Sequence, residues 1–175
     1  MTAYGKTILT FLGLVAITLL LLSERSFLFG GVLCLLLLVL SYIDLTKYKI
    51  PDWINALILI TGVLFNIYND HDLLNALISF LIAGSLFYFI SFLFFKIKNR
   101  QGLGGGDIKL FAASAVWLNF YFLPFVLLIS SLSALIYAVL SRSTKIPFGP
   151  FLAIGIWVTW LFGSELLELL STIRF

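Results

Sequence analysis

The 175-residue sequence has few charged residues, one cysteine and one histidine. Charged residues make up 11% of the chain and hydrophobic residues 62%, whereas soluble domains are about a quarter charged. One cysteine, Cys34, excludes an internal disulfide and a cysteine-based zinc cluster. One histidine, His71, cannot build a zinc protease site. We therefore expect a membrane protein that uses no metal or other cofactor.

Seven apolar runs, separated by short polar loops, divide the chain. They are Thr7–Leu22, Phe27–Ile43, Trp53–Tyr68, Leu73–Phe95, Ile108–Leu118, Tyr121–Leu140 and Phe151–Leu170. A spanning helix needs about 20 mostly apolar residues, and the fifth run is too short to span alone. No cleavage site follows the first run, so it is interpreted as a permanent helix. The sequence predicts an all-α fold, a polytopic integral membrane bundle of six or seven transmembrane helices, with one domain over residues 1–175.

The distribution of basic residues predicts the orientation of the bundle. With a cytosolic N-terminus and seven helices, nine of the 11 basic residues face the cytosol: Lys6, Lys47, Lys49, Lys96, Lys98, Arg100, Lys109, Arg142 and Lys145. Loops rich in Lys and Arg stay in the cytosol, so we expect the N-terminus and any active site between these loops at the cytosolic face of the cell membrane. The net charge of +3 then reflects topology and the lipid bilayer, and it does not indicate nucleic acid as a partner.

Two aspartates lie at the edges of apolar runs, where a carboxylate is costly and is a functional candidate. Asp44 ends the second run, and Asp107 ends the glycine-rich segment before the fifth. Paired carboxylates suit aspartic proteolysis, in which one ionised group activates water and a protonated group polarises the carbonyl. Asp107 opens a helix and Asp44 closes one. From the helix dipole we expect Asp107 to start as the base and Asp44 as the acid.

Each of these residues also has a simpler interpretation. Asp107 is typical of a helix N-cap, the glycines before it of a flexible linker, and Asp44 of a polar helix end. Asp52 after Pro51 is interpreted as the N-cap of the third helix. The alternative function is a multi-pass transporter or structural subunit with non-catalytic interfacial aspartates. A transporter predicts charges within helices, and this sequence has essentially none.

Three segments, read together, resemble the cytosolic motifs of the type IV prepilin peptidases, which belong to the intramembrane aspartic proteases with a G-x-G-D motif. The segments are D-L-T-K-Y-K-I-P-D (Asp44–Asp52), G-L-G-G-G-D-I-K (Gly102–Lys109) and K-I-P-F-G-P-F-L-A-I-G (Lys145–Gly155). The resemblance implies that Asp44 and Asp107 are the catalytic pair, and that the substrates are prepilins or pseudopilins cut at the cytosolic face. The candidate substrate-loop residues are Gly104, Gly105, Gly106, Pro51 and Pro147.

The chain departs from many bacterial members of this family in one respect. Those members carry an N-terminal insertion with paired C-x-x-C motifs, associated with zinc and with methylation of the new N-terminus. This sequence, with one cysteine, resembles the short form without the insertion. We therefore expect peptidase activity without methyl transfer, and the residues leave open whether a pilus, secretion or competence protein is cut.

Overall fold

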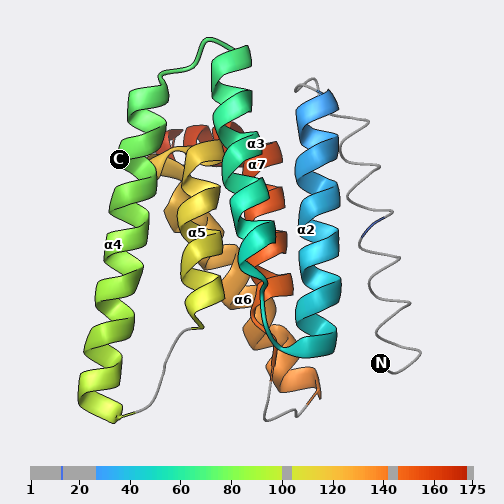
Figure 1. Ribbon diagram of the computed structural model, residues 1–175, viewed down its shortest axis with the longest axis vertical. Coiled ribbons are helices and arrows are strands. Elements are labelled where there is room, and N and C mark those ends of the chain that lie inside the picture. The colour runs from blue at the N-terminus through green and yellow to red at the C-terminus, as the bar shows by residue number, and fades with distance from the viewer. Residues whose placement is uncertain (1–12, 14–26, 100–103, 142–145, 173–175) are drawn as a thin grey trace.

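The structure, a computed structural model, describes residues 13, 27–99, 104–141 and 146–172, and this part of the chain is helical. Its elements are α2 (Phe27–Lys47), α3 (Asp52–Tyr68), α4 (Leu73–Lys98), α5 (Gly105–Leu118), the 3-10 helix η1 (Phe120–Phe122), α6 (Leu123–Ser141) and α7 (Gly149–Thr172). The helices run side by side as one bundle (Figure 1). The all-α prediction is confirmed for these residues. The first predicted helix, Thr7–Leu22, lies outside them apart from Gly13.

Four of the described helices, α2, α4, α6 and α7, are long and apolar enough to cross a membrane. With 17 residues, α3 is at the lower limit of length. With 14 residues, α5 is about 21 Å long, against a hydrocarbon core of about 30 Å. The chain is therefore a multi-pass membrane protein, and the number of six or seven spans stays a prediction.

The helices extend past the apolar runs that predicted them. For example, α4 continues beyond Phe95 to Lys98, and α5 begins at Gly105, so that Asp107 and Lys109 belong to it as expected. A helix can continue beyond its apolar run, because its polar side chains at the membrane surface still reach water.

The bundle consists of two groups of helices. α5 packs most extensively against α4 and α3, whereas α7 packs most extensively against α6 and α2. We call α3, α4 and α5 the Asp107 half, and α2, α6 and α7 the Asp44 half. In Figure 1, α5 stands between α4 and α3, and every residue from Leu110 to Leu118 is buried. In contrast, only 17% of the apolar stretch of α4 and of α6 is buried, so both present their side chains to lipid.

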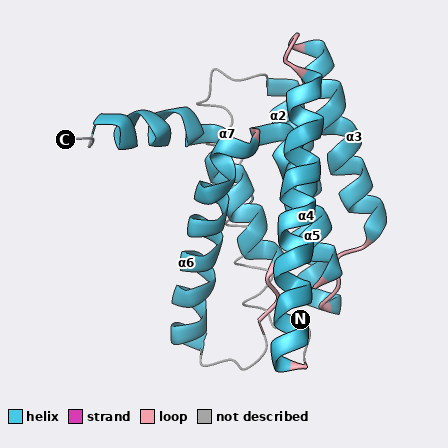
Figure 2. Ribbon diagram, turned by 90° about the vertical axis from the view of Figure 1, so that its left-hand side faces the viewer, coloured by secondary structure: helices cyan, strands magenta, loops and turns pink. Residues whose placement is uncertain are grey.

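The end of α7 leaves the bundle. Its last buried residue is Gly163, and the turns that follow extend sideways (Figure 2). A Gly-Ser pair is a common site of helix bending, and Gly163 is followed by Ser164. Only the first part of α7 therefore packs in the bundle. This part begins at the same end of the bundle as Asp44 and Asp107.

Candidate active site

Asp44 lies close to the end of α2, and its side chain is only 5% exposed. The backbone N–H of Gly149 donates a hydrogen bond to Asp44 Oδ2 over 2.9 Å. Gly149 is the first residue of α7, so its N–H has no acceptor within the helix. A Cβ atom at Gly149 would lie 2.6 Å from Asp44 Oδ2. Glycine is thus needed for the start of α7 to approach this carboxyl so closely.

Asp107 lies in the first turn of α5, and its carboxyl folds back over Gly104, the N-cap residue. The backbone of Gly104 hydrogen-bonds to this carboxyl, as an acidic residue does at the third position of a capping box. A Cβ atom at Gly104 would lie 2.8 Å from Asp107 Oδ2. The N-cap interpretation of Asp107 is therefore corrected, because Gly104 holds that position. Each aspartate has a glycine backbone against its carboxyl.

The pKa of Asp107 is raised to about 6, first by burial and then by the charge of Asp44, while the hydrogen bond from Gly104 acts to lower it. Asp107 lies outside the four helices that are long enough to span the membrane. Asp44 and Asp107 come from different halves of the bundle, so this repulsion between like charges acts across their junction.

Both aspartates line one cavity of about 580 Å³. The two halves of the bundle and the segment before α7 all contribute to it. Its lining residues are Asp44, Tyr48, Phe87, Gly104, Asp107, Leu127, Ser131, Ile146, Pro147 and Phe148. A volume of this size is typical of a ligand site, as are apolar walls around a few polar groups.

Of the five candidate substrate-loop residues, Gly104 and Pro147 line this cavity. The other three lie elsewhere. Gly105 has open space where a side chain would be, whereas a Cβ atom on Gly106 would lie 2.8 Å from Ile50 Cβ. Pro51 holds the N-cap position of α3. Gly106 and Pro51 therefore belong to the junction of α3 and α5.

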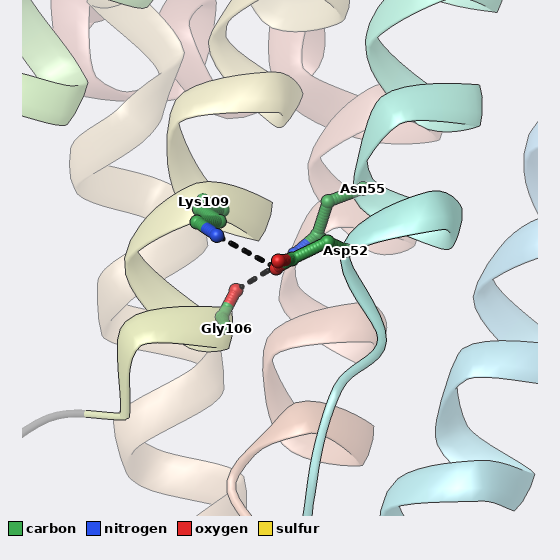
Figure 3. Close-up of polar contacts among 4 residues, drawn as sticks. All are labelled: Asp52, Asn55, Gly106 and Lys109. Atoms are coloured by element: carbon green, nitrogen blue, oxygen red, sulfur yellow. Dashed lines mark hydrogen bonds and ion pairs between the residues drawn. The ribbon is translucent and has the colours of Figure 1, made fainter.

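Asp52 has a different partner from the one predicted. Because Pro51 is the N-cap, Asp52 is the first residue of α3 and does not cap it, so the N-cap prediction is wrong. Asp52 Oδ1 instead forms an ion pair with Lys109 Nζ of α5 over 2.7 Å. Beside it, Asn55 Nδ2 donates a hydrogen bond to the Gly106 carbonyl over 3.1 Å. Figure 3 shows both contacts between the first turns of α3 and α5.

The sequence did not identify several cavity residues. Phe148 lines the cavity, and the N–H of the next residue, Gly149, donates to Asp44; neither residue was among the candidate site residues. Tyr48 gave no signal at all. It has a φ of 52°, a left-handed conformation that is costly for a residue other than glycine. This conformation directly follows α2 and places Tyr48 at the cavity.

The described residues provide no metal site of the usual kind. Within ranges 27–99, 104–141 and 146–172, no three His, Cys, Asp or Glu side chains lie close enough together to hold a metal ion. The chemistry available at the cavity is that of two carboxyls, two glycine backbones and the Ser131 and Tyr48 hydroxyls.

Comparison with known proteins gives a consistent set of relatives. The model of the type IV leader peptidase family matches residues 31–139. The prepilin leader peptidase/N-methyltransferase of Aeromonas salmonicida is 37% identical over 146 residues, which are 78% of this chain and 50% of that protein. The proteins of that name from Dichelobacter nodosus and Pseudomonas aeruginosa are 33% and 32% identical; the matches cover 76% and 74% of this chain and 48% of each relative.

The chain spans about half the length of the curated relatives it matches. The family match, in contrast, covers most of the chain and includes both Asp44 and Asp107. No solved structure matches the chain significantly.

Proposed function

Because the chain belongs to the type IV leader peptidase family, we propose that it is a membrane-embedded aspartic endopeptidase that removes the leader of prepilin-like proteins. The observation that carries this proposal is that Asp44 and Asp107, from different halves of the bundle, line one cavity. Each carboxyl also accepts a hydrogen bond from a glycine backbone. The proposal concerns peptide cleavage alone.

In the proposed mechanism, Asp44 is the base and Asp107 the acid, which reverses the expectation from the sequence. The Gly149 N–H at the start of α7 stabilises a negative charge on Asp44. The raised pKa of Asp107 favours its protonated form. Ionised Asp44 accepts a proton from the attacking water, while the Asp107 proton polarises the scissile carbonyl. The expectation from the sequence considered only the helix to which each aspartate belongs, whereas the proposed assignment also includes the Gly149 N–H of a neighbouring helix.

The cavity suits an extended, largely apolar segment of polypeptide. Phe87, Leu127 and Phe148 provide apolar walls, and Gly104 leaves backbone accessible beside Asp107. We propose that the peptide is cut before the hydrophobic helix of the prepilin. The basic residues near this end of the bundle, such as Lys47 and Lys49, support a cytosolic active site in the bacterial inner membrane.

The transporter and structural-subunit alternatives are not favoured. Neither explains why the chain matches a peptidase family over the residues that contain both aspartates. Neither requires two glycine backbones to approach two carboxyls at the distances observed here.

The proposal is tested by incubating the purified full chain, in detergent or vesicles, with a type IV prepilin or a pseudopilin. Mass spectrometry then locates any cut. We expect a single cleavage that removes the leader, and no cleavage by Asp44→Asn or Asp107→Asn. Cleavage that persists in both variants, or its absence with every prepilin class, would overturn the proposal.

A further inference from the structure

The first turn of α5 carries Asp107, and α3 together with Ile50, just before α3, contacts this turn in three ways. The Gly106 backbone packs against Ile50 so closely that a Cβ atom on Gly106 would lie 3.2 Å from the Ile50 carbonyl oxygen. Asn55 donates a hydrogen bond to the Gly106 carbonyl, and Asp52 pairs with Lys109 (Figure 3). Gly106 directly precedes Asp107, so any shift of this backbone moves the carboxyl that follows.

We propose that Asn55 is a positioning residue, which fixes the first turn of α5 against α3 and thereby sets the place of the Asp107 carboxyl. The proposal rests on the function proposed above. Asn55 does not line the cavity, so it acts on the reaction only through the α5 backbone.

Packing alone does not account for an asparagine at this position. Asn55 is only 4% exposed, and its Oδ1 has no hydrogen-bond partner among the residues that the structure describes. A buried polar atom without a partner is destabilising, and a leucine of similar size would avoid this cost. The orientation of the amide follows from its neighbour, because the Gly106 carbonyl accepts and so must face the Nδ2 group.

The ion pair beside Asn55 supports the same alignment of the two helices. Asp52 and Asn55 are three residues apart on α3, and their partners Lys109 and Gly106 are three residues apart on α5. Residues at this spacing share one face of a helix. Asp52 and Lys109 are largely exposed, and exposed pairs contribute little. The buried contact of Asn55 is therefore the one that we assign the positioning role.

The chain provides a matched control on the same pair of helices. Asn66 is also buried on α3, and its Nδ2 donates to the Val116 carbonyl of α5 over 2.8 Å. Asn55 and Asn66 thus share residue type, burial and a carbonyl of α5 as acceptor, while Asn66 Nδ2 also donates to the Gly62 carbonyl of its own helix over 2.8 Å. They differ in where their acceptors lie. The acceptor of Asn55, Gly106, directly precedes Asp107, whereas Val116 lies nine residues after Asp107.

The experiment compares Asn55→Leu with Asn66→Leu in the full-length protein. Thermal unfolding measures how far each substitution destabilises the fold, an effect that both variants are expected to share. Steady-state cleavage of a prepilin, corrected for the folded fraction, separates kcat from KM. We expect Asn55→Leu to lower kcat about tenfold or more, since small misplacements of a reacting group have effects of this order. Asn66→Leu should keep the wild-type kcat.

A second readout is independent of cleavage. The infrared band of the protonated carboxyl, assigned by its loss in Asp107→Asn, gives the titration midpoint of Asp107. The titration midpoint of Asp107 should differ from the wild-type value in Asn55→Leu and equal it in Asn66→Leu. Equal kcat and equal midpoints in the two leucine variants would overturn the positioning role. If the wild-type protein cleaves no prepilin, the proposed function fails, while the midpoints still decide whether Asn55 positions Asp107.

Discussion

The helices of the two halves are joined by different main contacts, although Gly106 of the Asp107 half also packs closely against Ile50. In the Asp107 half, side chains form hydrogen bonds to the backbone of the facing helix: Asn55 to Gly106, Trp117 to Ile58 and Asn66 to Val116. In the Asp44 half, helices approach each other at glycines. A Cβ atom on Gly155 of α7 would lie 2.5 Å from the Val126 carbonyl of α6.

This difference shows how a membrane protein can place two carboxyls at one cavity by two kinds of helix contact. Directional bonds fix the register of α3 and α5, and therefore the height of Asp107 in the bundle. On the other side, the glycine contact that brings α7 close also provides the N–H that reaches Asp44. The cavity forms where the two halves meet, so neither half alone provides both carboxyls.

The largest expected effect is the loss of either aspartate, one from each half. Asp44→Asn and Asp107→Asn should each lower the cleavage rate by at least ~10²–10⁴-fold, since each removes an acid–base group. The double variant should be no slower than the slower single variant, because the two residues act as one unit. Initial rates with a prepilin, on protein shown to be folded by its unfolding curve, measure this. Additive losses would show that the two carboxyls work separately.

A smaller effect is expected from the glycines that contact the carboxyls. Gly104→Ala and Gly149→Ala should lower kcat roughly tenfold, because each new methyl group displaces a carboxyl oxygen that lies within 2.8 Å of it. Gly105→Ala is the matched control. A Cβ atom there meets nothing within 4 Å, and alanine favours the helix.

The glycine comparison is read from kcat at saturating prepilin. Equal losses at positions 104 and 105 would indicate that the segment needs its flexibility, and that the close approach of Gly104 to Asp107 is not what requires glycine there.

The protonation of the pair can be followed by titration. The pKa of Asp107 is raised to about 6, first by burial and then by the charge of Asp44. Asp107 is therefore protonated below this pH, and cleavage that needs it as an acid should fall as the pH rises through this value. In Asp44→Asn the neighbouring charge is gone, so the midpoint of Asp107 should decrease while burial still keeps it raised. An infrared carboxyl band that vanishes in Asp44→Asn and survives in Asp107→Asn would reverse the assignment of acid and base.

The helices and the aspartates were predictable because their signals are local. Hydrophobic runs located each described helix to within a few residues, and α3 ends at Tyr68 and α5 at Leu118, as predicted. The two aspartates stood out because charge at the edge of an apolar run is costly.

The partners of the polar residues were not predictable, because they depend on which helices become neighbours. Asn55 and Asn66 are single polar residues in an apolar run, and nothing local shows that both donate to carbonyls of α5, 51 and 50 residues away. The role of Gly149 beside Asp44 spans 105 residues. Asp52 was predicted to be an N-cap because its local pattern fits one. Its ion pair with Lys109 depends on the tertiary fold and could not be read from the local sequence.

The smallest expected effect concerns stability and tests the contrast between the halves directly. Trp117→Phe removes the Nε1–H that donates to the Ile58 carbonyl over 2.8 Å, a buried bond between two helices. Ser130→Ala removes a hydroxyl that donates to the Val126 carbonyl of its own helix, a local bond that contributes little. The loss of one hydrogen bond costs about 1 kcal/mol, so Trp117→Phe should lower the free energy of unfolding by that amount. Ser130→Ala should change it by less than about half as much, since α6 and α7 are held by the fit at Gly155. Unfolding curves in the same detergent compare the two variants. If Ser130→Ala were the more destabilising, hydrogen bonding by this hydroxyl would be part of what holds the Asp44 half together, and the distinction between the halves would fail.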